Sequence, residues 1–336
     1  MQDQLNIFVD EMVNIPGLCF RPVQSPVDYA RIAALRAETN RHDGIESTDD
    51  PAQIQHFFET MEGFNLQRDL ILAEVNGEMV GYARVREYEE TQTGKRIFSM
   101  YGMVHPAQRG QGLGRALVRR VEQIARTVLA QNPGEQPAYL DAFVNSYSAN
   151  AQDLFQQEGF TLERIFYRMI RPDLENIPDL PLPPGIETRP VLPEHYRIIW
   201  DAAMDAFREH WGFHDEGEEA YQGYLASDEF QPELWQIAWE GDQVVGIVRS
   251  FVDRKLNERY HFRRGWTEDI CVRKAWRDKG IAKALIARSL QTLKDHGMDH
   301  AALGVDAENA SGALRIYESM GYRVDGSQDI ALRKAL

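Results

Sequence analysis

The stretch VRKAWRDKGIA, from Val272 to Ala282, decides the expected fold of this chain. It joins a short apolar strand to an apolar-periodic helix through a turn that contains arginine and glycine. A second copy, VHPAQRGQGLG, runs from Val104 to Gly114, and both copies fit Arg-x-x-Gly-x-(Gly/Ala). Such a turn leaves several backbone N–H groups unpaired at the positive end of a helix, and its small residues let a ligand approach the main chain closely. The turn therefore predicts a cradle for a pyrophosphate.

Two other phosphate-binding motifs fit these turns poorly. A P-loop requires a lysine and a hydroxyl residue after its second glycine, and neither turn has them in place. A dinucleotide-binding fingerprint requires Gly-x-Gly-x-x-Gly, and the stretch from Gly110 to Gly114 has the wrong last interval. The sequence therefore favours neither a nucleoside triphosphatase nor a Rossmann domain.

The chain carries an internal duplication. Four landmarks recur in the same order at an offset of 162 to 168 residues. They are Arg21-Pro22-Val23 with Arg189-Pro190-Val191, Val80-Gly81 with Val245-Gly246, Arg109 with Arg277, and Gly159 with Gly321. Between the copies lies a proline-rich stretch that disfavours helix and is typical of an extended linker. We therefore expect domains over residues 1–172 and 186–336, joined by a linker over 173–185.

Each copy predicts the same order of elements. A β-hairpin is expected over 70–85 and again over 234–250, because Asn76-Gly77 and Gly241-Asp242 are strong turn signals. A further strand leads into the glycine turn, and the helix behind the turn has one apolar face. Another strand, a helix ending at Gly159 or Gly321, and a last strand close each unit. The fold class expected is α+β, a mixed sheet flanked by helices, in two tandem domains.

Composition narrows the class of protein. The 336 residues are 43% hydrophobic and 26% charged, as in soluble globular proteins. We expect a cytoplasmic protein without a membrane span, since no signal-peptide pattern is evident and the two cysteines, Cys19 and Cys271, lie far apart. The formal charge of −15 argues against a nucleic-acid partner and suits a cationic small substrate, although it also fits plain solubility.

The motifs resemble those of the GNAT superfamily of N-acetyltransferases, which bind acetyl-CoA through an Arg/Gln-x-x-Gly-x-Gly/Ala turn. The second copy adds another element similar to that family, NASGALRIYESMGY, from Asn309 to Tyr322. Two such units in one polypeptide resemble the arrangement of mycothiol synthase and related tandem acetyltransferases. The resemblance covers nearly the whole chain, from about Phe20 to Leu336.

The resemblance implies acetyl-CoA as cosubstrate, held mostly by main-chain N–H groups. In the second copy the implied cofactor-binding residues are Ile270, Cys271, Val272, Arg277, Asp278, Lys279, Gly280, Ile281, Ala282, Lys283 and Asn309. In the first copy they are Val104, Arg109, Gly110, Gln111, Gly112, Leu113 and Gly114. A covalent acyl-cysteine at Cys271 is disfavoured, because no basic partner is identifiable.

Direct attack of an amine on a thioester needs a base and an acid. Tyr317 is the expected general acid, since a phenol can donate a proton to the departing thiolate. Glu268 is the expected base; it lies four residues before Val272, so alternation would place both on one face of the strand. Asp269, the second choice, would then point to the opposite face, and many bases of the family lie two residues earlier, at Trp266 here. A tyrosine packed on the sheet and a solvated acid at a strand edge are the alternatives.

An aromatic-rich segment in the second copy is expected to contact the acceptor. It contains His210, Trp211 and His214 between the first two helices. Lining a substrate and plain packing fit these residues equally well. The two histidines are four residues apart, but Gly212 interrupts the helix and no third ligand is evident, so no metal is expected.

The first copy departs from the catalytic pattern. The position that corresponds to Tyr317 is Phe155, which cannot donate a proton. Counting back from Val104 gives Met100 and Phe98 at the two base positions, and neither is acidic. Tyr101 and Tyr147 could substitute, although their spacing does not require it. We therefore expect the first unit to bind coenzyme A weakly or not at all and to serve a structural or regulatory role.

The sequence thus predicts an acetyl-CoA-dependent N-acetyltransferase that acts on a small cationic amine in a ternary complex, with the chemistry in the C-terminal domain. A non-catalytic acyl-CoA-binding regulator and an O-acyltransferase are the alternatives. The expected partner is a small-molecule amine, and the chain is expected to be a monomer or a homodimer.

Overall fold

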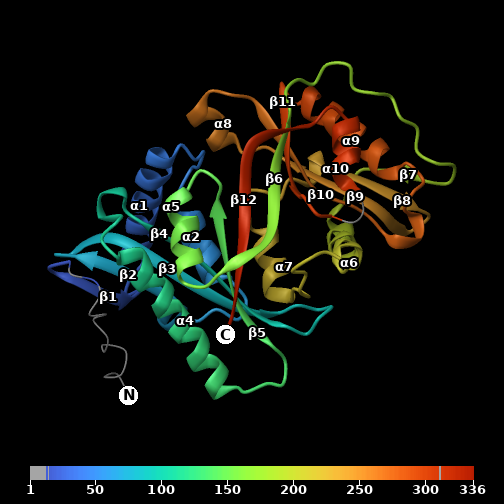
Figure 1. Cartoon of the computed structure of the whole chain (residues 1–336). Coiled ribbons are helices and arrows are strands. Elements are labelled where there is room, and N and C mark those ends of the chain that lie inside the picture. Colours follow the sequence, from blue (N-terminus) through green and yellow to red (C-terminus); the bar gives the residue numbers. More distant parts are fainter. Residues whose placement is uncertain (1–12, 14, 310–311) are drawn as a thin grey trace. The chain divides into compact units, whose positions relative to one another are not determined.

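The computed structural model describes residues 13, 15–309 and 312–336, and these form two compact units (Figure 1). The first unit contains the described residues up to Glu163 together with Ile330–Leu336. The second unit is Arg164–Asp329. Ala310 and Ser311, which belong to the motif that begins at Asn309, lie outside the described residues.

The first unit is a mixed sheet flanked by helices. Its sheet order is β1-β2-β3-β4-β5, followed by the C-terminal end of β12, and only the β4–β5 pair is parallel among the pairs formed by β1 to β5. The elements that begin in this unit are β1 (Leu18–Pro22), α1 (Val27–Asp43), α2 (Pro51–Glu59), α3 (Leu66–Asp69), β2 (Leu70–Val75), β3 (Glu78–Glu89), β4 (Arg96–Val104), η1 (Pro106–Gln108), α4 (Leu113–Gln131), β5 (Ala138–Asn145), α5 (Ala149–Gln157) and β6 (Thr161–Arg171).

The second unit repeats this plan, with the strand order β6-β11-β10-β9-β8-β7. Here too a parallel pair, β10 with β11, lies inside an otherwise antiparallel sheet. Its remaining elements are β7 (Glu187–Thr188), η2 (Pro193–His195), α6 (Tyr196–Phe207), α7 (Glu218–Leu225), η3 (Pro232–Leu234), β8 (Gln236–Glu240), β9 (Gln243–Phe251), α8 (Arg254–Tyr260), β10 (Arg264–Val272), η4 (Lys274–Trp276), α9 (Ile281–Asp295), β11 (His300–Asp306), α10 (Ala313–Ser319) and β12 (Arg323–Ala335). The fold class expected from the sequence, a mixed α+β sheet flanked by helices in two units, is confirmed.

The turns form where the sequence expects them. Asn76 and Gly77 both have positive φ, 51° and 88°, as a tight hairpin between β2 and β3 requires. Gly159 and Gly321 have φ of 88° and 86° just after α5 and α10, which is the left-handed conformation that ends a helix.

The compact units differ from the sequence repeats in two segments. Phe166–Arg171, at the end of the first repeat, pairs antiparallel with β11 and belongs to the second unit. Ile330–Leu336, at the end of the second repeat, belongs to the first unit, where the Leu336 N–H donates to the Ala138 carbonyl at 3.0 Å. Each sheet is therefore completed by a strand segment that the other repeat supplies.

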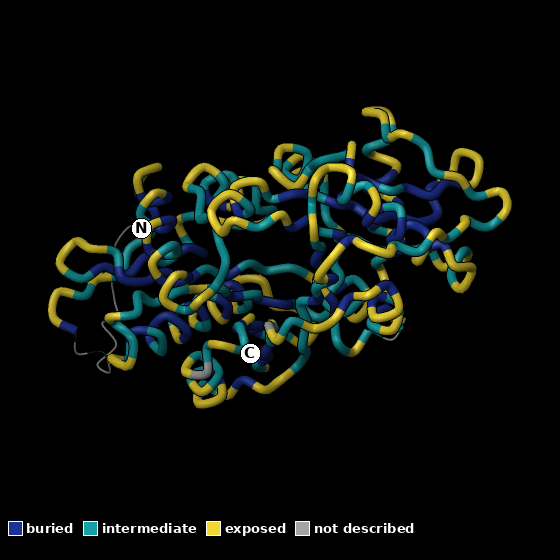
Figure 2. Tube along the Cα trace, turned by 90° about the horizontal axis from the view of Figure 1, so that it is seen from above, coloured by how far each residue is buried: buried dark blue, intermediate teal, exposed yellow. Residues whose placement is uncertain are grey.

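Each unit has apolar cores on the two faces of its sheet. In the first unit, α4 covers one face with Leu113, Leu117 and Val121, and α1 and α2 cover the other face. In the second unit, α9 and α10 pack on one face and α6 packs on the other. Buried stretches accordingly run along the strands and the inner faces of the helices, and exposed stretches follow the loops (Figure 2). Within the described part of the chain, no helix has both the length and the apolar character to cross a membrane.

The proline-rich stretch between the repeats forms neither helix nor strand from residue 172 to 186. It nevertheless packs on the core of the second unit through Leu174, which is buried, and through Ile177, Leu180 and Leu182. Its proline residues thus remove regular structure while its apolar residues hold it against the sheet.

A buried charge cluster holds the C-terminal segment in the first unit. The Arg333 guanidinium donates two hydrogen bonds to Asp141, each 2.7 Å, and one to Glu90 at 2.9 Å. The side chains of these three residues are at most 6% exposed. Asp141 lies on β5, so the cluster ties the last residues of the chain to the sheet of the first unit.

We expect Arg333→Leu to destabilise the first unit by about 3–5 kcal/mol, because the change leaves two buried carboxylates without their counter-ion. Chemical denaturation followed by circular dichroism measures the effect. The control is Lys334→Met, which removes a partly exposed pair with Glu122 and should cost at most about 1 kcal/mol. Equal effects for the two variants would contradict this role of Arg333.

Candidate active site

The hydrogen-bond ladder of the second unit opens between β10 and β11. The two strands pair in parallel only from Arg264 to Trp266, and no further register joins their later residues. Beyond the ladder, the Gly304 N–H of β11 donates to Oε1 of Glu268 at 2.9 Å. A side chain of β10 therefore takes the place of a backbone partner for this N–H.

A β-bulge at Asp269 corrects the sequence-based placement of the base. The register of β10 with β9 shifts between Glu268 and Cys271, so β10 holds one residue more than β9 there. Asp269 takes the left-handed conformation, with φ of 48°. An extra residue reverses the alternation of side chains beyond it. Val272 consequently packs with the α9 core, whereas Glu268 pairs in register with Arg249 on the α6 side, so the expectation that Glu268 and Val272 share a face is wrong.

Glu268 has the environment of a base that works near neutral pH. Burial, with the charges of Asp269 and Glu229 nearby, raises the pKa of Glu268 to about 8. The Gly304 N–H opposes this shift only in part. A carboxylate with a raised pKa accepts a proton more readily than an ordinary surface acid.

Asp269 is held by an arginine in an aromatic setting. Its carboxylate forms an ion pair with Arg249 at 2.8 Å, and the Arg249 side chain is only 6% exposed. The guanidinium lies over the rings of Tyr224, Trp200 and Trp235, at 4.6 to 5.8 Å from their centroids. Because Arg249 lies on the α6 side, the expectation that Asp269 points away from Glu268 is wrong. The pairing leaves Glu268 rather than Asp269 available as a base.

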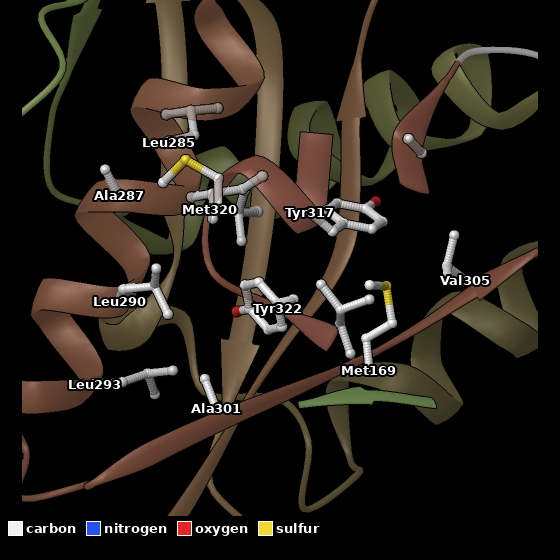
Figure 3. Close-up of a cluster of buried hydrophobic side chains, with 14 of the residues drawn as sticks. Met169, Leu285, Ala287, Leu290, Leu293, Ala301, Val305, Tyr317, Met320 and Tyr322 are labelled. Carbon is white, nitrogen blue, oxygen red and sulfur yellow. The ribbon is translucent and has the colours of Figure 1, made fainter. Parts of the chain in front are cut away.

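Tyr317 of α10 is near enough to Glu268 for that charge to act on its phenol. Its ring is buried in the core beneath α9, and its hydroxyl points away from Leu285 and Met320 (Figure 3). Among the described residues, that hydroxyl has no hydrogen-bond partner. Burial raises the pKa of Tyr317, and the nearby charge of Glu268 raises it further. Tyr322 differs, since its hydroxyl is hydrogen-bonded to Thr267 at 2.7 Å.

The turn before α9 presents a row of free main-chain donors. Asp278 and Gly280 have positive φ, 63° and 83°, and α9 begins at Ile281. In the part of the chain that the structure describes, the N–H groups from Asp278 to Lys283 donate to no protein acceptor. A Cβ added at Gly280 would meet nothing within 4 Å. Free amides at the start of a helix are the kind of donors that suit a phosphate, and the binding of a diphosphate here stays a prediction.

The motif arginine has a structural role that the sequence reasoning missed. The Arg277 Nε donates to the Val272 carbonyl at 3.1 Å, and Nη1 donates to Glu209 at 2.7 Å. The side chain thus joins the end of β10 to the segment after α6. Its fixed distance of five residues from the strand valine was the available signal, because that spacing lets the guanidinium reach back to the strand end.

The remaining cofactor candidates of the second unit lie around this turn and opening. Ile270 and Val272 pack with the α9 core, and Cys271 is buried on the other face, where burial raises the pKa of its thiol. Lys279 and Lys283 are exposed and have no acidic partner among the described residues. Asn309 follows β11, and its carbonyl accepts from the Gly312 N–H.

The aromatic segment after α6 lies within the second unit. Trp211 contacts the ring of Phe166 at 5.9 Å, and His210 contacts that of Phe207 at 4.7 Å. Burial lowers the pKa of His210, and the charge of Arg277 lowers it further. His214 lies 3.7 Å from Glu216. No group of three metal-ligating side chains occurs among the residues described.

Comparison with known proteins agrees with this geometry. The family model "Acetyltransferase (GNAT) family" matches residues 196–322, and "Acetyltransferase (GNAT) domain" matches residues 67–162. A mycothiol acetyltransferase of Salinispora tropica is 30% identical over 257 residues, which is 74% of this chain and 75% of that protein. The chain belongs to the GNAT acetyltransferase family. It is therefore an acyltransferase with two GNAT units in tandem.

Three further comparisons cover most of the chain. A mycothiol acetyltransferase of Streptomyces bingchenggensis is 28% identical over 89% of this chain and 90% of its own. The crystal structure of a GCN5-related N-acetyltransferase from Sphaerobacter thermophilus has a TM-score of 0.71 at 27% identity, and the match covers 96% of this chain and 97% of that one. A tandem GNAT protein from the clavulanic acid biosynthesis pathway shares the fold, with a TM-score of 0.66 over 95% of this chain and 98% of its own, at 12% identity.

The first GNAT unit keeps the turn but has different side chains at the positions that correspond to Tyr317 and Glu268. Gly110 and Gly112 have φ of 76° and 90°, and the N–H groups from Gly110 to Arg115 have no acceptor among the described residues. The Arg109 Nε donates to the Val104 carbonyl, as Arg277 does in the second unit. Gln111, Leu113 and Gly114 complete this turn, with Leu113 buried at the start of α4.

Phe155 occupies the place of Tyr317, buried at the edge of the α4 core and in ring contact with Phe160 at 5.0 Å. Tyr101, rather than Met100, occupies the place of Glu268. Tyr101 pairs with Arg84 of β3, just as Glu268 pairs with Arg249 of β9. The count along the sequence failed because β4 has no bulge between Tyr101 and Val104, whereas β10 has one.

Proposed function

We propose that this GNAT protein is an acetyl-CoA-dependent N-acetyltransferase that acts on a small cationic amine, with the chemistry in the second unit. One observation carries the proposal. Glu268, with its pKa raised to about 8, accepts from Gly304 beyond the β10–β11 ladder, and its charge acts on the phenol of Tyr317, which has no hydrogen-bond partner among the described residues. The row of free amides from Asp278 to Lys283 follows directly after β10.

The residues supply the two proton transfers that amide formation needs. Glu268 accepts a proton from the acceptor ammonium, directly or through a water, and leaves a neutral amine. The amine nitrogen attacks the thioester carbonyl, so a C–N bond forms and the C–S bond breaks. Tyr317 donates its proton to the departing thiolate and recovers one from solvent or from the acetylated amine.

A cationic acceptor fits the charges around the base. Burial and the charges of Asp269 and Asp253 raise the pKa of Glu229, which shows that several carboxyl groups lie close together. Arg249 forms its ion pair with Asp269 and offsets the repulsion at Glu229 only in part. An ammonium group approaching Glu268 would relieve this repulsion, whereas an anionic acceptor would increase it.

The charges at the two turns favour coenzyme A in the second unit. Lys279 and Lys283, which flank the free amides there, have no ion-pair partner among the described residues. The corresponding residues of the first unit are Gln111, which is neutral, and Arg115, which pairs with Glu158 at 2.8 Å. The turn of the first unit therefore has equivalent backbone amides but less unpaired positive charge beside them, among the described residues.

Gly280→Val should raise the Kd for coenzyme A at least about tenfold, since a β-branched residue at φ of 83° distorts the turn that presents the amides. The matched control is Gly112→Val, which places the same strain at φ of 90° in the first unit. Calorimetric titration of both variants measures Kd and the number of sites. If Gly112→Val weakens binding and Gly280→Val does not, the coenzyme binds in the first unit and this assignment is wrong.

Release of free thiol from acetyl-CoA in the presence of amines tests the function itself. The panel should hold polyamines, amino sugars, an amino-terminal peptide and the acceptor of the mycothiol acetyltransferases, with a matched set of alcohols. We expect amine-dependent release with a cationic acceptor. Release with alcohols alone would indicate O-acyl transfer, and no release with any acceptor would contradict the proposal.

A further inference from the structure

The first unit contains an arginine, Arg84, that has no counter-ion among the residues described. Arg84 lies on β3, opposite Tyr101 of β4, and its side chain is only partly exposed. Its guanidinium lies 5.4 Å from the ring centroid of Phe57 and 5.8 Å from that of Tyr101. No carboxylate, carbonyl or hydroxyl among the described residues accepts a hydrogen bond from it. A half-buried guanidinium in this state lacks the partner that such groups ordinarily have.

A second cation stands beside it. Arg36 of α1 lies over the same Tyr101 ring, at 5.9 Å from its centroid, and donates to the Tyr82 hydroxyl at 3.1 Å. Arg36 also pairs with Asp49 at 3.0 Å. That carboxylate is already occupied, because it accepts from Asn40 and Ser47 as well. Asp49 is therefore not available to Arg84, and the site has surplus positive charge.

The second unit shows what is missing here. Arg84 and Arg249 hold equivalent positions. Gly81 pairs with Val104, and Gly246 pairs with Val272. Each arginine is the third residue after its glycine. Arg249 is neutralised by Asp269, the residue of the bulge in β10. In the first unit β4 has no bulge at this point, so Arg84 keeps the position but has lost the carboxylate.

The electrostatics agree with this comparison. Burial lowers the pKa of Arg84, and the charges of Arg86 and Arg36 lower it further. In the second unit the carboxylate of Asp269 opposes the burial, and the pKa of Arg249 is raised. An anion bound at Arg84 would supply the same compensation.

We propose that the first unit binds an anionic group of a small molecule, a carboxylate or a phosphate, at Arg84 beside Arg36. The planar guanidinium can donate two parallel hydrogen bonds to such a group, which then takes the place that Asp269 has beside Arg249. This role goes beyond acetyl transfer, and it gives the degenerate unit a ligand of opposite charge to the acceptor of the second unit.

Binding of two probes, succinate and inorganic phosphate, tests the proposal on the full chain. Coenzyme A is present at saturation so that phosphate does not bind at an accessible turn, and the ionic strength is held constant with chloride. Calorimetric titration compares wild type with Arg84→Met and with Arg84→Lys, which keeps the charge but not the paired donors. The control is Arg126→Met, which removes one positive charge from an exposed pair on α4 of the same unit.

We expect at least one probe to bind wild type with a Kd of about 10 mM or tighter. Arg84→Met should then weaken it at least tenfold, Arg84→Lys severalfold, and Arg126→Met should leave it unchanged. If Arg84→Met fails to fold, Arg84→Lys decides. Tighter binding of succinate would indicate that the natural ligand carries a carboxylate, and tighter binding of phosphate would indicate that it carries a phosphate. Absence of binding of both probes to wild type, or equal binding by the Arg84 variants, overturns the proposal.

Discussion

Tyr317→Phe should lower kcat for acetyl transfer by about 10²–10⁴-fold, the usual contribution of a general acid. The change removes one oxygen and keeps the ring that packs beneath α9, so the core is preserved. The hydroxyl has no protein partner among the described residues, and its loss therefore breaks no hydrogen bond of the fold. The Kd for acetyl-CoA should change by no more than about twofold, because the phenol acts on the leaving thiolate.

Tyr322→Phe is the matched control for that prediction. Tyr322 is in ring contact with Tyr317 at 6.3 Å, but its hydroxyl is bonded to Thr267. Removing this hydroxyl should cost about 1 kcal/mol of stability and leave kcat nearly unchanged. Steady-state kinetics and thermal unfolding of both variants separate the two roles. Equal losses of kcat, or a Tyr317→Phe variant as active as wild type, would show that Tyr317 is not the acid.

Glu268→Gln should lower kcat/KM by about 10²–10⁴-fold as well, and it should change the pH profile. A base must be deprotonated to work, and the pKa of Glu268 is raised to about 8. In wild type, kcat/KM should therefore rise with pH up to about 8 and then level. In the variant that ionisation is absent, and only the titration of the amine substrate remains. An unchanged profile in Glu268→Gln would contradict the assignment.

The stability of the same variant separates loss of the base from loss of the fold. The pKa of Glu268 in the folded protein lies above its usual value near 4.5, so the ionised form is less stable in the fold than in the unfolded chain. This group therefore lowers stability as pH rises from about 4.5 through about 8. Glu268→Gln removes that penalty and can still accept from the Gly304 N–H. We expect its melting temperature at pH 8 to equal or exceed that of wild type.

Local patterns in the sequence were sufficient to predict the fold and the conformation of the two glycine turns. The Asn76-Gly77 hairpin, the glycines that end α5 and α10, and the two Arg-x-x-Gly-x-(Gly/Ala) turns each depend on a few adjacent residues whose conformation is limited by sterics. The correspondence of Phe155 to Tyr317 was also predicted, because each residue lies at the same distance before a glycine that ends a helix. The roles of Tyr317, Glu268 and the turn residues in catalysis stay predictions.

Three features depended on contacts that the sequence does not show. The repeat in the sequence shows which segments are equivalent but not which strands they pair with. The sequence therefore did not predict that Phe166–Arg171 belongs to the second unit and Ile330–Leu336 to the first. The bulge at Asp269 contains no glycine from which it could be predicted. The side chains of β10 were therefore expected to alternate without interruption, which is wrong. The ion pair between Arg249 and Asp269 was not predicted either, since it depends on the conformation of that bulge.

A crystal structure of the full chain with acetyl-CoA would show which unit holds the coenzyme. We expect the diphosphate on the amides from Asp278 to Lys283, with the thioester between β10 and β11. The sulfur should lie within about 3.5 Å of the Tyr317 hydroxyl, allowing for the larger radius of sulfur. Acetyl-CoA bound only at Gly110–Gly114, or a sulfur remote from Tyr317, would contradict catalysis in the second unit.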